Sequence, residues 1–169
     1  MTRRTPVLLL LLASGCAQPP THELEISAAR VEAARQLDAA IFAPELFAEA
    51  ESSLAEARRL AASEGDYLAA IQAAAHSTLR ANEAFFRASS ERSVSLRKLQ
   101  QLRFELKSLL EMAAYRGATA QAPTELSAFQ SRYEAIRAMV KERDLLDALA
   151  AGTALKPELV AFEKRFRRE

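Results

Sequence analysis

Residues 67–115 read YLAAIQAAAHSTLRANEAFFRASSERSVSLRKLQQLRFELKSLLEMAAY, and this stretch decides the fold. It contains no glycine or proline, and alanine, leucine, arginine and glutamate, all strong helix formers, dominate it. A single helix of this length would extend about 70 Å at roughly 1.5 Å per residue. Serine hydroxyls compete for backbone partners, so a kink or break near residues 88–94 is the alternative. We favour one continuous helix; the serines concerned are Ser89, Ser90, Ser93 and Ser95.

Two rows of apolar residues at heptad-like spacing, which we call seams, have the same length. The first lies in the second half of this stretch, and the second lies beyond it. The loop of residues 117–123 between them is short enough to fold the chain back on itself. The spacing therefore predicts an antiparallel, coiled-coil-like hairpin within residues 96–169, in which Gly152 ends one helix and Pro157 begins the last. The first seam is Leu99, Leu102, Leu106, Leu109 and Ala113, and the second is Leu126, Phe129, Tyr133, Ile136 and Val140.

The segment upstream of residue 67 predicts two more helices. One extends over residues 23–42, and the other begins at Pro44, since the first turn of a helix does not need the missing N–H of proline. Residues 63–66, Ser-Glu-Gly-Asp, end the second helix, and Asp66 is a good N-cap for the next. Small side chains let helices approach closely, so these helices should pack tightly. The chain is predicted to be all-α, with a single helical domain at 23–169 made of an Ala-rich part at 23–95 and the hairpin part. The expected core of the Ala-rich part is Leu54, Leu60, Tyr67, Ile71 and Phe85.

The sequence contains one internal similarity, which we call the echo. Residues 125–133, ELSAFQSRY, resemble residues 158–166, ELVAFEKRF, at an offset of 33 residues. Helix-hairpin repeats have a period near 34. Chance convergence of two amphipathic helices with the same core spacing is the interpretation that we favour.

The N-terminus has the parts of an export signal: Arg3 and Arg4, an apolar run at residues 7–12, and then small residues before Cys16. This run is too short to cross a hydrocarbon core, which needs roughly 20 apolar residues. Residues 12–16, LASGC, resemble the lipobox of bacterial lipoproteins. The resemblance implies a signal peptide at 1–15, cleavage between Gly15 and Cys16, and lipid on the Cys16 thiol. An ordinary secretory signal that leaves a free thiol is the alternative.

The residues that follow Cys16 indicate the membrane in which the protein would be anchored. Ala17 follows it, and in the lipoproteins of well-studied diderm bacteria a residue other than aspartate there implies sorting to the outer membrane. Residues 16–22, with two prolines, are expected to form a lipidated tether. The resemblance thus implies attachment to the membrane by lipid, on the periplasmic face of the outer membrane. No cofactor other than the covalent lipid is expected.

Charge and composition limit the partners. Removing Arg3 and Arg4 from the 23 basic residues leaves 21 against 22 acidic ones, a net charge of −1. Such a balance favours neither nucleic acid nor an anionic lipid surface. Residues 16–169, of a chain that is 50% hydrophobic, are enough for one domain with a real core.

Two further resemblances concern the Ala-rich part. Residues 65–71, GDYLAAI, look like the turn and second-helix start of a tetratricopeptide repeat. The landmarks Ala43-Pro44-Glu45-Leu46 and Gly65-Asp66-Tyr67 are also similar to those of an uncharacterised family of Ala-rich helical lipoprotein domains, sometimes found ahead of peptidoglycan-binding OmpA-like domains. This match covers roughly residues 24–105 and implies a fold rather than a reaction. No OmpA-like domain is visible in the sequence.

The sequence offers no recognisable catalytic constellation. His22 and His76 lack metal-ligand spacing, and no nucleophile elbow, Walker loop or dinucleotide-binding motif is present. Both histidines are expected to be solvated or close to helix caps. The only cysteine, Cys16, is expected to be acylated. We therefore predict a protein that is not an enzyme.

Two features of the long helix are candidates for a partner surface. Basic residues crowd its second half, and they indicate either a solvated face or contact with an anionic envelope component. Phe85 and Phe86 are adjacent and so face different ways, which leaves one free for a partner unless the first helix buries both; we favour burial of both. The candidate surface residues are Phe86, Arg97, Lys98, Arg103 and Lys107, with Arg92 beside them.

The sequence as a whole is typical of a non-catalytic cell-envelope lipoprotein that acts as a scaffold or interaction module for a periplasmic or outer-membrane protein partner. The alternative is a tetratricopeptide-like assembly factor, or pilotin, that binds a segment of a client outer-membrane protein in an apolar groove.

Overall fold

The computed structural model describes residues 19–166, and these residues form helices and turns without a strand. The predicted all-α fold is therefore confirmed. Along the chain the elements are α1 (Thr21–Gln36), α2 (Ala39–Phe42), α3 (Pro44–Arg59), the π-helical turn η1 (Leu60–Glu64), α4 (Tyr67–Ala113), η2 (Ala114–Ala118), α5 (Thr119–Gln121), α6 (Pro123–Glu142) and α7 (Leu145–Lys164).

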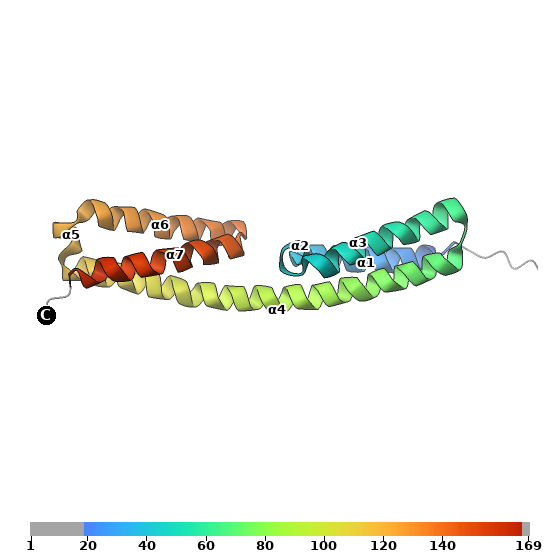
Figure 1. Ribbon diagram of the computed structural model, residues 1–169, viewed down its shortest axis with the longest axis horizontal. Coiled ribbons are helices and arrows are strands. Elements are labelled where there is room, and N and C mark those ends of the chain that lie inside the picture. Colours follow the sequence, from blue (N-terminus) through green and yellow to red (C-terminus); the bar gives the residue numbers. More distant parts are fainter. Residues whose placement is uncertain (1–18, 167–169) are drawn as a thin grey trace, which may run out of the picture.

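Helix α4 has 47 residues and is the spine of the molecule (Figure 1). The Asp66 carboxylate caps it by accepting a hydrogen bond from the Ala69 N–H at 3.0 Å, as the sequence predicts. It continues through residues 88–94 without a break, which confirms the continuous helix. The Ser93 hydroxyl donates to the Ser89 carbonyl at 2.8 Å, one turn back in the same helix, so this hydroxyl finds a partner without interrupting the helix.

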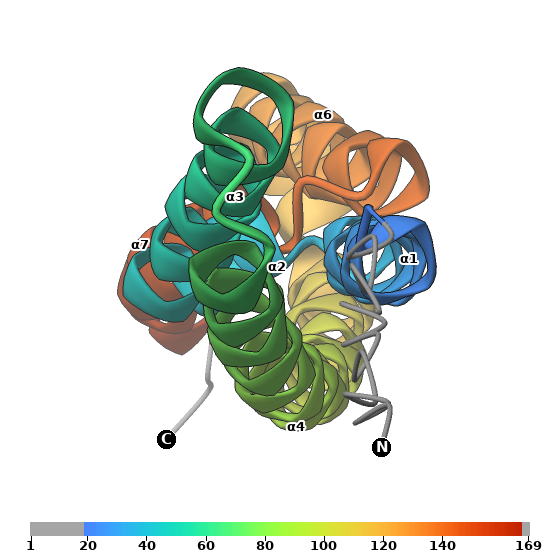
Figure 2. The same ribbon diagram turned by 90° about the vertical axis from the view of Figure 1, so that its right-hand side faces the viewer.

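Two bundles lie on the same side of α4, one at each end (Figures 1 and 2). The N-terminal bundle consists of α1, α3 and the first half of α4, and the C-terminal bundle consists of α6, α7 and the second half of α4. The opposite face of α4 is uncovered, and in Figure 1 it is slightly convex. Between the bundles the rod narrows, and we call this region the waist.

The predicted first helix is close at its start and wrong at its end. It begins at Thr21, inside the segment expected to be a tether, and it ends at Gln36 rather than at residue 42. Asp38 has the left-handed backbone angle φ 59°, and it separates α1 from α2. Aspartate tolerates this conformation better than most residues, so the chain can turn here without a glycine.

The C-terminal helices also differ from the prediction. The chain reverses at Arg143, whose φ is 72°, and α7 then passes through both Gly152 and Pro157, which were expected to mark helix ends. Pro157 removes the hydrogen bond to the Thr153 carbonyl, and both residues are exposed, so water can solvate that carbonyl. The hairpin of α4 and α6 is thus completed by α7 into a three-helix bundle.

Helix α7 contacts α4 more extensively than α6 does. Gly152 allows this approach, since a Cβ atom there would lie 2.6 Å from Cδ2 of Leu102. Both predicted seams contribute to one core, which is rich in leucine. Its buried members include Leu99, Leu102, Leu106, Leu110, Leu126, Ile136, Leu155, Leu159 and Phe162.

The N-terminal core is built mainly of alanine. Its only large buried side chains are Val31, Phe47 and Leu54. Closely packed alanines leave little room for bulk, so the expected core is only partly correct. Leu54 is buried, Ile71 is exposed, and Leu60, Tyr67 and Phe85 are half-buried.

The two bundles repeat one sequence of turns. A left-handed residue, Asp38 or Gly117, is followed six positions later by Pro44 or Pro123. The alanine before each proline has nearly the same backbone angles, φ −147° and ψ 54° at position 43 and φ −145° and ψ 55° at position 122. The next helix then ends in another left-handed residue, Gly65 or Arg143, and an aspartate.

The buried positions follow the same repeat. In the first helix of each bundle the offset is 79 residues, and in the third helix it is 78. The two bundles therefore share one pattern of turns and buried positions, and α4 is the last helix of the first bundle and the first helix of the second. The echo at 33 residues instead joins α6 and α7, which are neighbours within one bundle. Corresponding buried pairs are Ser27 and Leu106, Val31 and Leu110, Ala34 and Ala113, Ala39 and Ala118, Ala70 and Ala148, Ala74 and Gly152, Ser77 and Leu155, Ala81 and Leu159, and Ala84 and Phe162.

A buried pair of serines links all three helices of the N-terminal bundle. The Ser27 hydroxyl donates to Ser77 Oγ at 2.8 Å, and the Ser77 hydroxyl donates to the Ala50 carbonyl at 2.7 Å. We expect Ser77→Ala to lower the free energy of unfolding by about 1–3 kcal/mol, because it leaves the Ser27 hydroxyl buried without its acceptor. Ser27→Ala should cost less, since Ser77 keeps its own acceptor. Urea denaturation of both variants tests this order, and equal losses would contradict it.

Candidate functional site

The predicted lipidation site lies outside the described residues. Gly15 and Cys16 belong to the segment before residue 19, for which the structure gives no placement. The helical rod begins directly after Pro20, which precedes the first residue of α1.

The predicted basic residues do not form one surface. At about 100° per residue, Arg97 and Lys98 point to different sides of α4, and both are exposed. Arg103 is half-buried, and Lys107 lies 3.6 Å from Glu111 on the same helix. Arg92 is half-buried and lies 3.8 Å from Asp38, at the turn between α1 and α2. These cations therefore point to different sides of α4, and two of them lie beside acidic groups.

Phe86 lies on the uncovered face of α4 and is 70% exposed, so the favoured burial of both phenylalanines is wrong. Phe85 turns inward and packs against the N-terminal core. Phe86 is one of a line of exposed residues that we call the outer stripe. The outer stripe is Leu68, Leu79, Phe86, Arg97, Phe104 and Tyr115, and its apolar members are between 54% and 93% exposed.

The spacing of the outer stripe explains why it stays on one line. Its intervals are 11, 7, 11, 7 and 11 residues. On a helix of 3.6 residues per turn, 11 residues overshoot three turns by about 20° and 7 residues fall short of two turns by about 20°. The deviations cancel, so the stripe follows α4 over about 70 Å. This pattern was present in the sequence, but a search for heptads does not find it.

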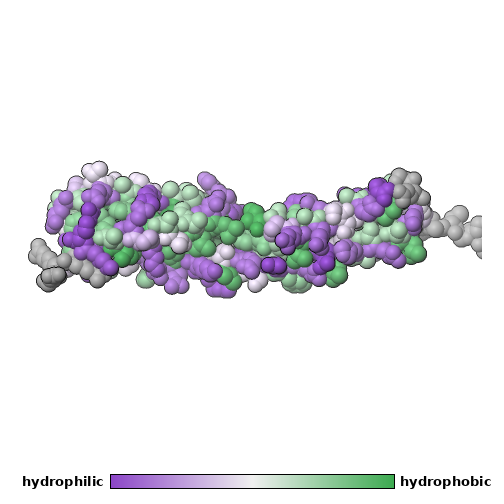
Figure 3. Space-filling view, in the orientation of Figure 1, coloured by the Kyte–Doolittle hydropathy of each residue, from purple (hydrophilic) through white to green (hydrophobic). Residues whose placement is uncertain are grey.

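The waist carries a second group of exposed apolar side chains. Phe42 contacts the cores of both bundles, and Ile41 and Leu146 are exposed beside it. Green, apolar residues gather at this point in the space-filling view (Figure 3). A hollow of about 160 Å³ separates Ile41 from Leu146 and has Arg143 and Asp147 among its lining residues.

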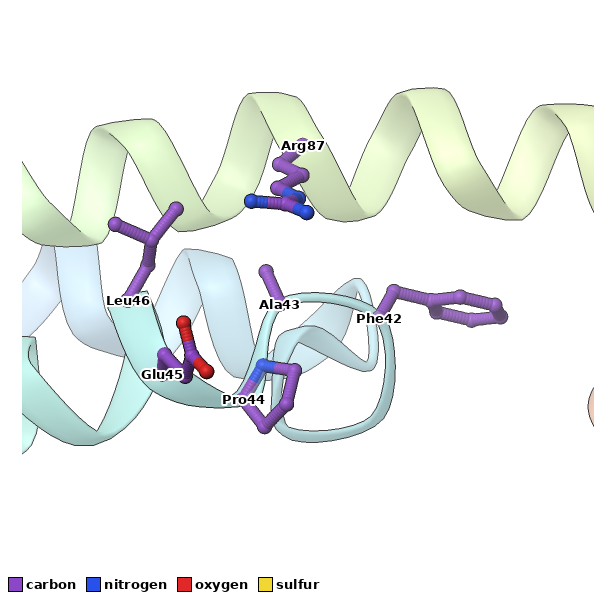
Figure 4. A pocket seen from close by; sticks show the side chains of 6 residues that line it. All are labelled: Phe42, Ala43, Pro44, Glu45, Leu46 and Arg87. Carbon is purple, nitrogen blue, oxygen red and sulfur yellow. The ribbon is translucent and has the colours of Figure 1, made fainter.

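A second hollow of about 160 Å³ lies on the other side of Phe42 (Figure 4). Arg87 extends into it from α4, above Ala43 and Pro44 at the start of α3. Small-molecule pockets usually enclose about 300–1,000 Å³. Both hollows are smaller, so they suit a side chain of a partner better than a whole ligand.

Surface ion pairs fasten the helices of the C-terminal bundle to one another. Lys156 lies 2.7 Å from Glu105, and this hydrogen bond holds the pKa of the Glu105 carboxyl below its usual value. Arg132 makes two hydrogen bonds to Glu158, at 2.6 and 2.8 Å, and lowers the pKa of that carboxyl in the same way. Both carboxylates thus serve as partners in ion pairs between helices.

Among the residues that the structure describes, one ion pair includes a fully buried carboxylate. Glu163 of α7 is completely inaccessible to solvent and pairs with Arg116 of η2. The equivalent position in the N-terminal bundle is Phe85, so this charge is specific to the C-terminal bundle. It connects the turn after α4 to the end of α7.

The structure also pairs Ser53 with His76, whose Oγ and Nδ1 atoms lie 3.0 Å apart. A serine nucleophile would need a third group to orient the ring. Among the residues whose side chains are described, no carboxylate is bonded to this histidine. The pair is exposed and joins α3 to α4, as a structural contact does.

Two other kinds of site were sought among residues 19–166. No three histidine, cysteine, aspartate or glutamate side chains there are grouped as ligands for a metal ion. Within the same residues, no helix has the length and apolar character needed to cross a bilayer.

Comparison with known proteins gives no relative: no family model, no curated protein and no solved structure matches the chain. The candidate site therefore rests on geometry alone, and it consists of the outer stripe and the waist.

Proposed function

We propose that this chain is a non-catalytic lipoprotein of the bacterial cell envelope that acts as a scaffold or interaction module. The observation that carries the proposal is the outer stripe, a line of exposed side chains, apolar except for Arg97, that follows the uncovered face of α4 and ends at Tyr115 in η2. Its members recur every 7 or 11 residues on one face of the helix, and exposed apolar side chains aligned in this way are candidates for contact with a partner. The long helix would extend the protein away from its anchor, and the outer stripe would provide the surface that contacts a partner.

The anchor is part of the same proposal. The lipobox-like residues 12–16 support lipid on Cys16, and Ala17 supports placement on the periplasmic face of the outer membrane. Two or more acyl chains would hold the protein there without a spanning helix. This placement would leave α1 beginning only a few residues from the membrane.

The anchor is tested by expressing Cys16→Ser in a diderm bacterium supplied with labelled palmitate. We expect the parent chain to carry the label and to fractionate with the outer membrane, whereas the variant should stay unlabelled and keep its signal peptide. Ala17→Asp is the matched control, since it should be labelled but remain at the inner membrane. A variant at Cys16 that is processed and membrane-bound like the parent would refute the anchor.

The interaction surface is tested by placing a photo-crosslinking amino acid at Phe86 or Phe104 in the anchored protein. Leu96 and Met112 are matched control positions, because they are exposed apolar residues of α4 outside the stripe. Crosslinks to a defined protein from the stripe positions alone are expected. Equal labelling from all four positions would contradict a specific surface.

A second candidate function is an assembly factor that binds a segment of a client outer-membrane protein. The exposed Ile41 and Leu146 beside the hollow at the waist favour it. Crosslinks from these two positions to a client, with none from Phe86 or Phe104, would support this function and would replace the first one.

A further inference from the structure

We propose that the partner of the outer stripe is a second copy of this chain, bound antiparallel with its α4 against the first. This inference rests on the proposed function in taking the stripe as the interaction surface. It adds the identity of the partner, the direction of the two helices and their register.

The first argument is the symmetry of the stripe. The intervals 11, 7, 11, 7 and 11 read the same from either end. A two-fold axis between residues 91 and 92 therefore brings every member of the stripe opposite another member, with residue numbers that add to 183. Such an isologous contact is the commonest form of association between identical chains. The facing pairs are Leu68 with Tyr115, Leu79 with Phe104, and Phe86 with Arg97.

The second argument is chemical complementarity. Leu79 and Phe104 offer two exposed apolar surfaces to each other. The only cation of the stripe, Arg97, faces the Phe86 ring, and a guanidinium over an aromatic face is attractive. The residues between stripe members on the same face of α4 also meet without like charges: Gln72 faces Glu111, Ala75 faces Ser108, and Ser90 faces Ser93.

Charge also selects the direction of pairing. In the antiparallel register Arg97 meets a phenylalanine and Glu111 meets a glutamine. A parallel pair in register would place Arg97 against Arg97 and Glu111 against Glu111. Like charges opposite one another destabilise an interface. The antiparallel dimer is therefore the favoured one.

The shape of α4 fits this arrangement. Its outer face is convex in Figure 1, so two such faces come closest at their middle. The small, exposed Ser90 and Ser93 lie at that point, so the two helices can approach closely there. Contact along the whole stripe, about 70 Å long and about 10 Å wide, would bury roughly 700 Å² per copy, which is an upper bound because convex faces separate toward their ends; a standard interface buries roughly 800 Å² per partner.

The test uses the chain with Cys16→Ser, which has no other cysteine. We expect sedimentation equilibrium at micromolar concentration to give twice the chain mass of 18.6 kDa. Phe86→Ser with Phe104→Ser should halve the observed mass, whereas Leu96→Ser with Met112→Ser, the matched control, should leave the dimer intact. Circular dichroism of both double variants checks that they remain helical.

Register and direction are tested by disulfide formation in the same background. A mixture of Leu79→Cys and Phe104→Cys chains should crosslink, because these positions face each other. Either variant alone should not, since its own thiols would lie about 37 Å apart along the axis. A parallel dimer would reverse this result and would overturn the proposal.

Other outcomes also overturn it. A chain that is monomeric at these concentrations has no self-association through the stripe. If that monomer binds phospholipid vesicles and loses binding with Phe86→Ser and Phe104→Ser, the stripe belongs to a membrane surface. If the anchored protein still crosslinks a different protein from Phe86, the proposed function stands while the dimer does not.

Discussion

Replacing Arg116 with methionine is expected to lower the free energy of unfolding by about 3 kcal/mol. Glu163 is completely buried, and Arg116 supplies the positive charge beside it. Removing one partner of a buried ion pair costs about 3–5 kcal/mol, because the remaining charge is left in a medium that solvates it poorly. The lower end applies here, since 31% of the Arg116 side chain is still in contact with water. Chemical denaturation followed by circular dichroism measures the loss.

The double variant Arg116→Met with Glu163→Leu should recover part of this stability, since it removes the buried charge together with Arg116. Arg137→Met is the matched control. It breaks an exposed pair with Glu134 on the same helix, and such pairs contribute about 0.3–0.5 kcal/mol. Equal free energies of unfolding for Arg116→Met and Arg137→Met would show that the pair of Arg116 and Glu163 contributes no more stability than an exposed pair.

Gly152→Leu is expected to destabilise the protein by about 3 kcal/mol or more. Even the Cβ atom of a larger residue would lie 2.6 Å from Cδ2 and 3.3 Å from Cγ of Leu102. Extra volume in a packed core usually costs about 1–3 kcal/mol, and here it must also push α7 away from α4. Gly152→Ala should change stability little, because a gain in helix propensity of about 1 kcal/mol opposes the clash.

Ala154→Leu is the control for this prediction, because Ala154 is exposed on the same helix and has room for the larger side chain. Thermal unfolding of the two leucine variants should differ by several degrees. Equal melting temperatures would show that α7 and α4 tolerate a wider separation than the structure indicates.

The parts of the fold that the sequence predicted depend on local chemistry. Asp66 as a cap, Pro44 as a first-turn residue and the absence of glycine from α4 act within a few residues, so they can be recognised without a structure. The break at Asp38 could not, because it depends on a left-handed backbone that aspartate adopts only in some settings. Gly152 and Pro157 were misleading for a related reason. Each normally ends a helix, but here a close neighbour and an exposed face accommodate them.

The repeated pattern was missed because the two bundles use different side chains for the same positions. Ser77 in one bundle corresponds to Leu155 in the other, and Ala84 corresponds to Phe162. The two bundles have the same backbone turns, but their core side chains differ in volume, so their sequences are not recognisably similar.

The candidate site was found only in part. Phe86 and Arg97 were among the predicted surface residues, and the structure places both on the outer stripe. Leu68, Leu79, Phe104 and Tyr115 were missed, because an exposed line with intervals of 11 and 7 residues lacks the contrast between apolar and polar faces on which helix patterns are usually judged. The waist depends on segments about 100 residues apart, and no local pattern could have joined Ile41 to Leu146.

The narrowing at the waist has a mechanical consequence. A beam that is thick at both ends and thin in the middle bends in the middle when a sideways force is applied. Here the thick parts are the two bundles, and the thin part is α4 near Ser89 and Ser93, supported from one side by Phe42. Bending at this point changes the angle between the bundles and leaves the packing inside each of them intact. We therefore expect any bending of the rod to occur near its centre rather than within either bundle.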